Sequence, residues 1–169
     1  MSDLTPSRSG IAAEHPEIIA GLETIYEILI EIGYVQNTDV QIPPHGVPKD
    51  PVNVAGLRAI GMDPQSIELI GRLPCFTDEV IIEHQKRSNT KDAIPIAPSS
   101  SAISYLVGSD FSSGVRETDP GNGELLPAWA LRITRATSPS GFNMAYDLNT
   151  SKLSAMESHF SMLTCLQKQ

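Results

Sequence analysis

LPAWALRIT at residues 126–134, SPSG at 138–141 and FNMAYDL at 142–148 follow one another in the later half of the chain. In the first segment, apolar and polar side chains alternate from Trp129 to Thr134, which is the period of a half-buried strand. Proline and glycine in the second segment favour a turn. The third segment is then expected to return as the antiparallel partner, so the three together predict a hairpin.

The N-terminal part of the chain has helical periodicity instead. Pro16 suits a first helical turn, and Gly33 suits a left-handed stop. Glutamates are expected to occupy the side of this helix opposite to its apolar stripe. Asp50-Pro51 and Asp63-Pro64 each resemble a cap followed by a first-turn proline, so they predict two shorter helices. The residues expected on the buried stripe of the first helix are Ile18, Leu22, Ile25, Leu29 and Ile32, widened by Ile19, Tyr26 and Ile30.

The order of these signals, helices first and antiparallel strands later, predicts an α+β fold. We expect N-terminal helices packed on a small antiparallel β-sheet. Residues 1–13 carry no periodicity and are expected to form a flexible tail, and residues 14–169 are expected to form a single domain.

The segments between the helices and the hairpin are less regular. Val80-Ile81-Ile82 is a short run of β-branched residues, which belongs to the strand-like later part of the chain. Two prolines restrict the segment 93–98 to an edge strand at most. Ser101–Val107 is expected to be a better strand. At the C-terminus, Ser154 and Glu157 match a capping box and favour a C-terminal helix, although the segment 160–166 also fits a strand.

Composition and charge exclude several classes of partner. The net charge is −8, and the densest basic stretch, residues 84–87, is too short for a nucleic-acid footprint. The same charge disfavours anionic membranes, and glutamates interrupt the longest apolar stretch, Ile18–Val35. Only two cysteines are present and the first ten residues are polar. The sequence therefore predicts a cytoplasmic protein that binds neither nucleic acid nor membrane.

The sequence contains none of the short motifs that usually announce a cofactor. It has no phosphate-binding loop, no GxGxxG, no GxSxG and no CxxC. The four histidines are scattered, so no local metal-ligand spacing arises. We therefore expect no cofactor and no metal.

A candidate acid–base pair lies on a proline-rich loop. His45 follows two prolines and precedes a glycine, and Asp50 comes five residues later. A histidine held on a stiff loop suits a general base, and a nearby carboxylate can orient it. The plainer alternative is that proline and glycine only shape a surface loop, and this alternative stays open.

The predicted hairpin supplies the other candidates. Arg132 is expected to bind a carboxylate, and Tyr146 to donate a proton or a hydrogen bond. Trp129, Tyr105 and Tyr34 are expected to form the walls of a substrate-binding hollow. The alternative is structural: Trp129 and Tyr146 would be core aromatics, and Arg132 would pair with Asp147 at the surface.

Several segments carry a resemblance to known families. The chain is similar, over roughly residues 16–153, to a large family of small fungal proteins for which no chemistry is established. The hairpin around Trp129 and Tyr146-Asp147 faintly resembles the end of SUKH-type domains, the superfamily of the yeast cell-wall synthesis regulator, which implies an α+β interaction module. The segments that carry the fungal resemblance are 22–29, 42–45, 73–76, 102–106 and 126–132.

Two functions of different classes follow. The first is a cofactor-independent enzyme or binder of a small, largely apolar organic molecule, an isomerase or cyclase of natural-product (secondary) metabolism, because such chemistry needs only a shaped pocket and a few polar groups. The second is a non-catalytic SUKH-like protein-interaction module, in which an exposed apolar patch or sheet edge carries the function. A homodimer is left open in either case.

Overall fold

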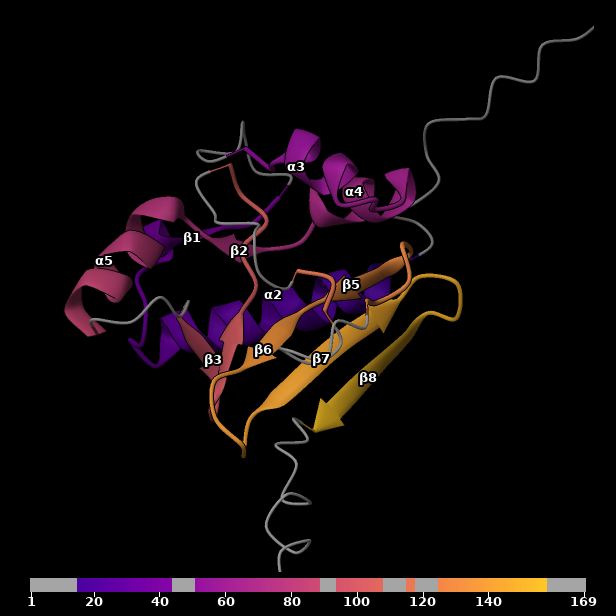
Figure 1. Ribbon diagram of the computed structural model, residues 1–169. Coiled ribbons are helices and arrows are strands. Elements are labelled where there is room, and N and C mark those ends of the chain that lie inside the picture. The colour runs from indigo at the N-terminus through magenta and orange to yellow at the C-terminus, as the bar shows by residue number, and fades with distance from the viewer. Residues whose placement is uncertain (1–14, 44–50, 89–93, 108–114, 118–124, 158–169) are drawn as a thin grey trace, which may run out of the picture.

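The computed structural model of the protein describes residues 15–43, 51–88, 94–107, 115–117 and 125–157. These residues form an α+β fold, as the order of helical and strand signals predicts. The longest helix among the described residues, α2 (Pro16–Glu31), lies behind the strands in the view of Figure 1. Its buried residues Ile18, Leu22 and Tyr26 lie at helical spacing, and Gly33 adopts a φ of 71° just after its end.

Three shorter helices and a 3-10 turn complete the described helical part of the chain. They are η1 (Asn37–Asp39), α3 (Val54–Ala59), α4 (Pro64–Ile70) and α5 (Asp78–Ser88). Asp63 caps α4 as predicted, because its Oδ1 accepts a hydrogen bond from Gln65 N at 2.9 Å. The predicted cap at Asp50-Pro51 is wrong: α3 begins at Val54, and Asn53 accepts from Gly56 N instead.

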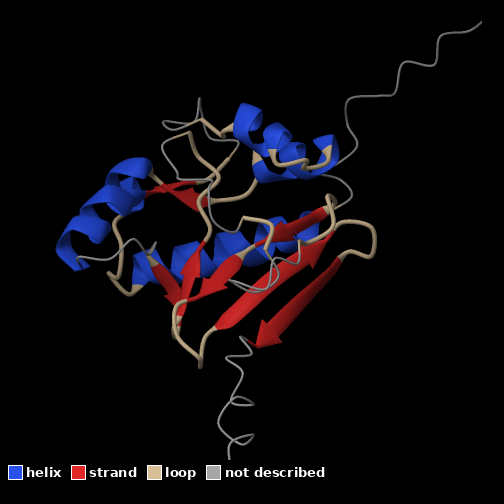
Figure 2. Ribbon diagram, in the orientation of Figure 1, coloured by secondary structure: helices blue, strands red, loops and turns tan. Residues whose placement is uncertain are grey.

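The strands of the described residues form three small antiparallel sheets. Two-residue strands β1 (Val40–Gln41) and β2 (Cys75–Phe76) pair with each other. A second sheet has the order β3-β4-β6, and a third has the order β5-β7-β8. Figure 2 shows the strands of the last two sheets side by side across α2. Their bounds are β3 (Pro95–Ala97), β4 (Ser100–Ala102), β5 (Ala130–Arg132), β6 (Thr134–Ala136), β7 (Phe142–Asp147) and β8 (Lys152–Glu157).

A seam between β5 and β6 joins these two sheets. Ile133 N donates to Met144 O at 2.7 Å, so the segment stays next to β7 beyond the end of β5. Thr134 Oγ1 then donates to Phe142 O at 2.8 Å and accepts from Met144 N. Asn143 Oδ1 accepts from Ala136 N at 2.9 Å. Where β6 leaves β7 and turns towards β4, the side chains of Thr134 and Asn143 therefore make the hydrogen bonds between strands that backbone groups make elsewhere in the sheet.

The predicted hairpin is confirmed, and its register explains which side chains face α2. Leu131 lies opposite Tyr146, and Arg132 lies opposite Ala145. Leu131 and Tyr146 belong to the main core with Ile18 and Leu22 of α2. Arg132 therefore projects from the opposite face of the sheet, because successive side chains of a strand alternate.

Four other expectations need correction. Val80-Ile81-Ile82 lies inside α5, whose first turn is acidic and last turn basic, an arrangement that favours a helix. The strand expected over Ser101–Val107 is only the three-residue β4. Ser154–Glu157 does not begin a helix, because it belongs to β8, which pairs along its whole length with β7. The tail expected at 1–13 lies outside the described residues, and so does the segment 158–169.

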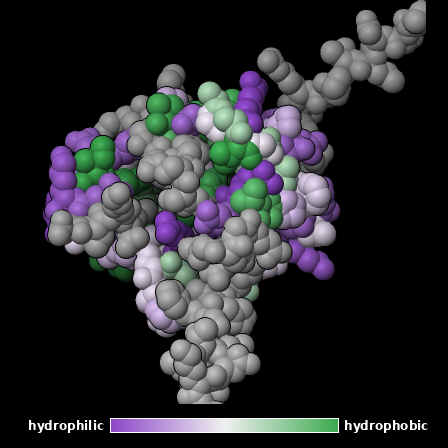
Figure 3. All heavy atoms as spheres, viewed as in Figure 1, coloured by the Kyte–Doolittle hydropathy of each residue, from purple (hydrophilic) through white to green (hydrophobic). Residues whose placement is uncertain are grey.

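Ile32 is the fourth correction. It was expected on the buried stripe of the first helix, yet it follows the end of α2 as its C-cap and is 68% exposed. In the view of Figure 3, hydrophobic and hydrophilic residues alternate over the visible face, and uncovered apolar side chains occur in several places. None of the helices in the described part of the chain is both long and apolar enough to cross a bilayer.

Candidate functional site

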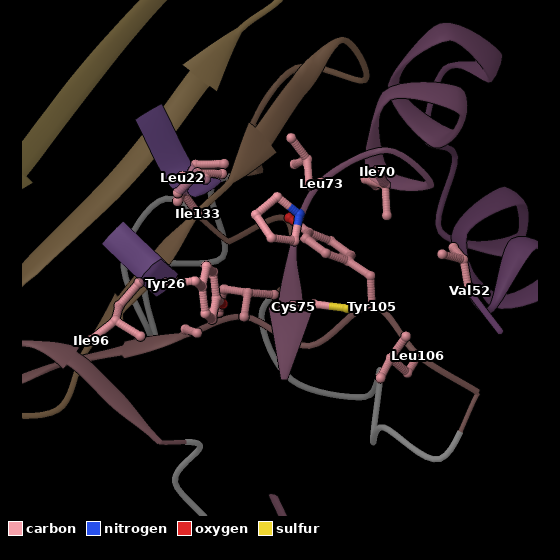
Figure 4. Close-up of a pocket in the computed structure, with 13 residues that line it drawn as sticks. Leu22, Tyr26, Val52, Ile70, Leu73, Cys75, Ile96, Tyr105, Leu106 and Ile133 are labelled. Atoms are coloured by element: carbon pink, nitrogen blue, oxygen red, sulfur yellow. The ribbon is translucent and has the colours of Figure 1, made fainter. Parts of the chain in front are cut away.

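A small hollow lies between α2, α4 and the strands (Figure 4). Its volume is about 30 Å³, which is room for about one water molecule. Aliphatic side chains form most of its wall, so a ligand there would meet few polar groups. The lining residues include Leu22, Tyr26, Ile70, Cys75, Tyr105 and Ile133.

Three polar side chains line this hollow, those of Tyr26, Cys75 and Tyr105. Tyr105, predicted to bind substrate, donates its hydroxyl to the backbone oxygen of Arg132. Burial raises the pKa of Tyr105 above its ordinary value, and burial together with the nearby Cys75 thiol raises the pKa of Tyr26. Gln41 Nε2 lies 3.2 Å from Cys75 Sγ and donates to it. Both phenols therefore stay protonated near neutral pH and suit hydrogen bonding rather than base catalysis.

Tyr146, predicted as a catalytic donor, is buried and bonded within the protein. Its hydroxyl lies 2.9 Å from Nδ1 of His15, the residue that precedes α2, and the two rings make an edge-on contact. Ser151 Oγ lies 3.4 Å from the same nitrogen, and Ser151 has a positive φ of 53°. These contacts connect the beginning of α2 to β7 and to the turn before β8. His15 was missed by sequence reasoning, because a lone histidine before a proline gives no local signal.

Arg132 is fully buried. Its guanidinium Nη2 donates to Asn143 Oδ1 at 2.7 Å, across the hairpin. The alternative in which Arg132 pairs with Asp147 at the surface is therefore wrong. The guanidinium has no exposed surface and already makes contacts within the protein, so a substrate carboxylate would have to displace those contacts to bind it.

Trp129 is not a core aromatic, because 41% of its surface is exposed. It lies just before β5, where the peptide backbone is held in place: Leu148 N donates to Trp129 O. The neighbouring Ala128 O accepts from Asp63 N and from Ser66 Oγ. The indole ring is thus presented to solvent from a rigid backbone.

Tyr34, the last of the predicted binding residues in the described chain, borders a second and larger hollow. This open cleft has a volume of about 740 Å³ and lies between the end of α2, η1 and α5. Its walls are mainly polar and include Tyr34, Asp39, Thr77, Glu79, Glu83, His84 and Arg87. Glu83 and Arg87 form an ion pair of 2.7 Å within this wall.

The predicted site residues are therefore distributed over separate places. Tyr105 donates to the backbone oxygen of Arg132, and Tyr105 and Tyr146 both belong to the main core, whereas the Arg132 side chain projects from the opposite face of the hairpin. Trp129 and Tyr34 are exposed elsewhere. His45 and Asp50 fall outside the described residues. Among the residues that the structure describes, no group of three metal-ligating side chains is close enough to hold an ion.

The outward face of α2 is a feature that sequence reasoning missed. Ile28 and Ile32 are 49% and 68% exposed, one helical turn apart. Glu23, Glu27 and Glu31 follow α2 at intervals of four residues beside them. The sequence carried a signal for this face, because too many apolar residues occur on the helix for a single buried stripe.

The chain was compared with models of protein families, with curated proteins and with solved structures, and no significant match was found.

Proposed function

We propose that this domain is a non-catalytic protein-interaction module. The observation that carries the proposal is the outward face of α2, where Ile28 and the C-cap residue Ile32 are uncovered beside the residues that face the core. Large apolar side chains that lie next to each other on the surface of a protein commonly mark a partner site.

The interior of the protein supports the same proposal. An isomerase or cyclase for an apolar intermediate needs a hollow of several hundred cubic ångströms. The apolar hollow has a volume of only about 30 Å³. Tyr105 and Tyr146 each make a hydrogen bond within the protein, which gives both hydroxyls a structural role. The faint resemblance of the hairpin to SUKH-type domains, which are α+β interaction modules, favours the same proposal.

Photocrosslinking from defined surface positions tests this function. A photoreactive amino acid would replace Ile28, Trp129 or Leu153 in the full chain, since each of these side chains is exposed. Thr150, an exposed polar residue on the turn before β8, is the control position. In an extract of the source cells, we expect one protein species to crosslink from an apolar position and not from Thr150.

The competing enzymatic function predicts a different result. We expect Tyr146→Phe to leave crosslinking unchanged, because its hydroxyl bonds to His15 inside the protein. The proposal would be abandoned if no position captured a protein and the chain converted a small molecule in a reaction that Tyr146→Phe abolished.

The open cleft favours a second candidate function, the binding of a small polar molecule. Its volume of about 740 Å³ lies in the range of ligand sites, and its walls offer carboxylates and the guanidinium of Arg87. Ligand-observed NMR with a library of polar metabolites would detect such binding. A hit in this cleft should weaken in both His84→Gln and Tyr34→Phe, while Ile28→Ser should leave it unchanged. Binding that survives both cleft variants would contradict this candidate.

A further inference from the structure

The outward face of α2 has two parallel rows of side chains. With 3.6 residues per turn, Glu23, Glu27 and Glu31 form one row along the helix. Ile28 and Ile32 form a second row, which is displaced from the glutamate row by about a quarter to a third of a turn around the helix axis. Gly21 lies on the second row, and a Cβ atom at Gly21 would meet no atom within 4 Å. The helix thus presents an acidic row beside an apolar row with open space over its first half.

The charges of α2 lack a counterpart within the described protein. The helix contains no lysine or arginine, and Glu31 lies in the last turn, where the helix dipole favours cations. Glutamates spaced by four residues also repel each other. Within the described part of the chain, none of the three glutamates of the acidic row forms an ion pair; the ion pairs found there join Glu68 to Arg72 and Glu83 to Arg87. This arrangement lowers the stability of the isolated helix and favours a cationic partner.

We propose that the outward face of α2 binds a cationic amphipathic helix of another protein, an inference that rests on the proposed interaction function. The apolar row of the partner would cover Ile28 and Ile32, and its lysines or arginines would lie along Glu23, Glu27 and Glu31. Viewed from outside with the N-terminus at the top, each helix would carry its charged row on the same side of its apolar row. Two such helices bring charged row against charged row and apolar row against apolar row when they pack antiparallel. The 16 residues of α2 span about 24 Å, enough for four turns of a partner helix.

The acidic row also decides against two other occupants. A second copy of the chain would bring Glu27 and Glu31 towards the same residues of its partner, and like charges at an interface disfavour association. An anionic membrane surface would repel the row for the same reason. Charge complementarity therefore selects a basic partner.

A synthetic amphipathic peptide of about 18 residues, with one leucine row and one lysine row, is the probe. It would be titrated into the isotope-labelled full chain, and amide shifts would be followed by NMR. We expect shifts confined to α2 and its neighbours, and a dissociation constant that rises several-fold between low and physiological salt because salt screens the ion pairs. A matched peptide with glutamate in place of lysine should bind at least tenfold more weakly.

Variants of the chain test separately how the apolar row and the acidic row contribute to peptide binding. Ile28→Ser with Ile32→Ser should weaken the lysine peptide at least tenfold without unfolding the chain, because both side chains are exposed. Glu27→Lys with Glu31→Lys should reverse the preference, so that the glutamate peptide binds more tightly than the lysine peptide. Ile82→Ser, an exposed position on α5, is the control and should change neither affinity.

Other results would overturn the inference. Equal binding of the two peptides, or shifts centred away from α2, would exclude an electrostatic helix site on this face. A dimer in sedimentation experiments that dissociates in the Ile28→Ser and Ile32→Ser variant would assign the face to a second copy. Photocrosslinking of a protein partner from Trp129 or Leu153 but not from Ile28 would refute this inference while the interaction function stands.

Discussion

Two buried tyrosines show how a single residue couples the fold to pH. Burial raises the pKa of Tyr26, and the neighbouring Cys75 thiol raises it further; burial also raises the pKa of Tyr105. The unfolded chain releases these phenolic protons above about pH 10, whereas the folded chain retains them. Their contribution to the free energy of unfolding is therefore complete below pH 10 and is lost as the pH rises further.

We accordingly predict alkaline destabilisation. Above about pH 10, the free energy of unfolding should fall by up to about 1.4 kcal/mol per pH unit for each of the two tyrosines. Urea unfolding at a series of pH values would measure this slope. Tyr26→Phe should remove about half of it, whereas Ile28→Ser, which removes no phenol, should leave it nearly unchanged. An identical slope in wild type and Tyr26→Phe would contradict the assignment.

The second prediction at this scale concerns Arg132. Truncation to alanine removes a fully buried guanidinium, leaves a void and deprives Asn143 of a donor, so Arg132→Ala should lower the free energy of unfolding by about 3–5 kcal/mol. Arg135→Ala, three residues away at a partly exposed position of β6, should cost about 0.5 kcal/mol or less. Chemical denaturation would compare the two, and similar losses would show that burial does not decide the effect.

At the scale of elements, two glycines make opposite predictions. A Cβ at Gly141, in the turn before β7, would lie 1.9 Å from the backbone oxygen of Ser99, so Gly141→Ala should cost about 3 kcal/mol. On the open outer face of α2, Gly21→Ala should raise the free energy of unfolding by about 0.5–1 kcal/mol, because alanine favours a helix. Thermal and urea unfolding would report both changes. A loss of stability in Gly21→Ala would show that this face is covered.

The elements also show what the sequence can and cannot predict. α2 and the β5–β7 hairpin follow from strong local periodicity. The edge position of β3 follows from Pro95, which cannot donate a backbone hydrogen bond. Val80–Ile82 was misassigned because a run of three β-branched residues has no period, whereas the charges at the two ends of α5 favour a helix. Ser154 and Glu157 satisfy a capping pattern, yet pairing with β7 determines their conformation.

The candidate site was less predictable than the fold. Whether Trp129 is buried depends on which segments pack over it, and alternation alone places it only on one side of a strand. The contact of His15 with Tyr146 joins residues 131 positions apart, and no local pattern contains that information. The exposure of Ile28 and Ile32 follows from the tertiary packing of α2, which periodicity indicates only through the excess of apolar residues.

For the whole molecule, we predict an uneven distribution of local stability. α5 contains no buried residue, whereas α2 buries Ile18, Leu22 and Tyr26 in the two main core clusters. Local opening is easier where few apolar contacts must be broken. Hydrogen exchange measured by NMR should therefore show at least about tenfold faster exchange for the amides of α5 than for the central amides of α2. Equal protection in both helices would mean that the protein opens only as a unit.

The seam between β5 and β6 has a consequence for the descent of this protein. Backbone hydrogen bonds survive almost any substitution, but those of Thr134 and Asn143 disappear with their side chains. Mutation can therefore open the sheet here more easily than anywhere along the β7–β8 ladder. Over evolutionary time, we expect homologous sequences either to retain a hydroxyl at 134 together with an amide at 143, or to exchange both and straighten the strand.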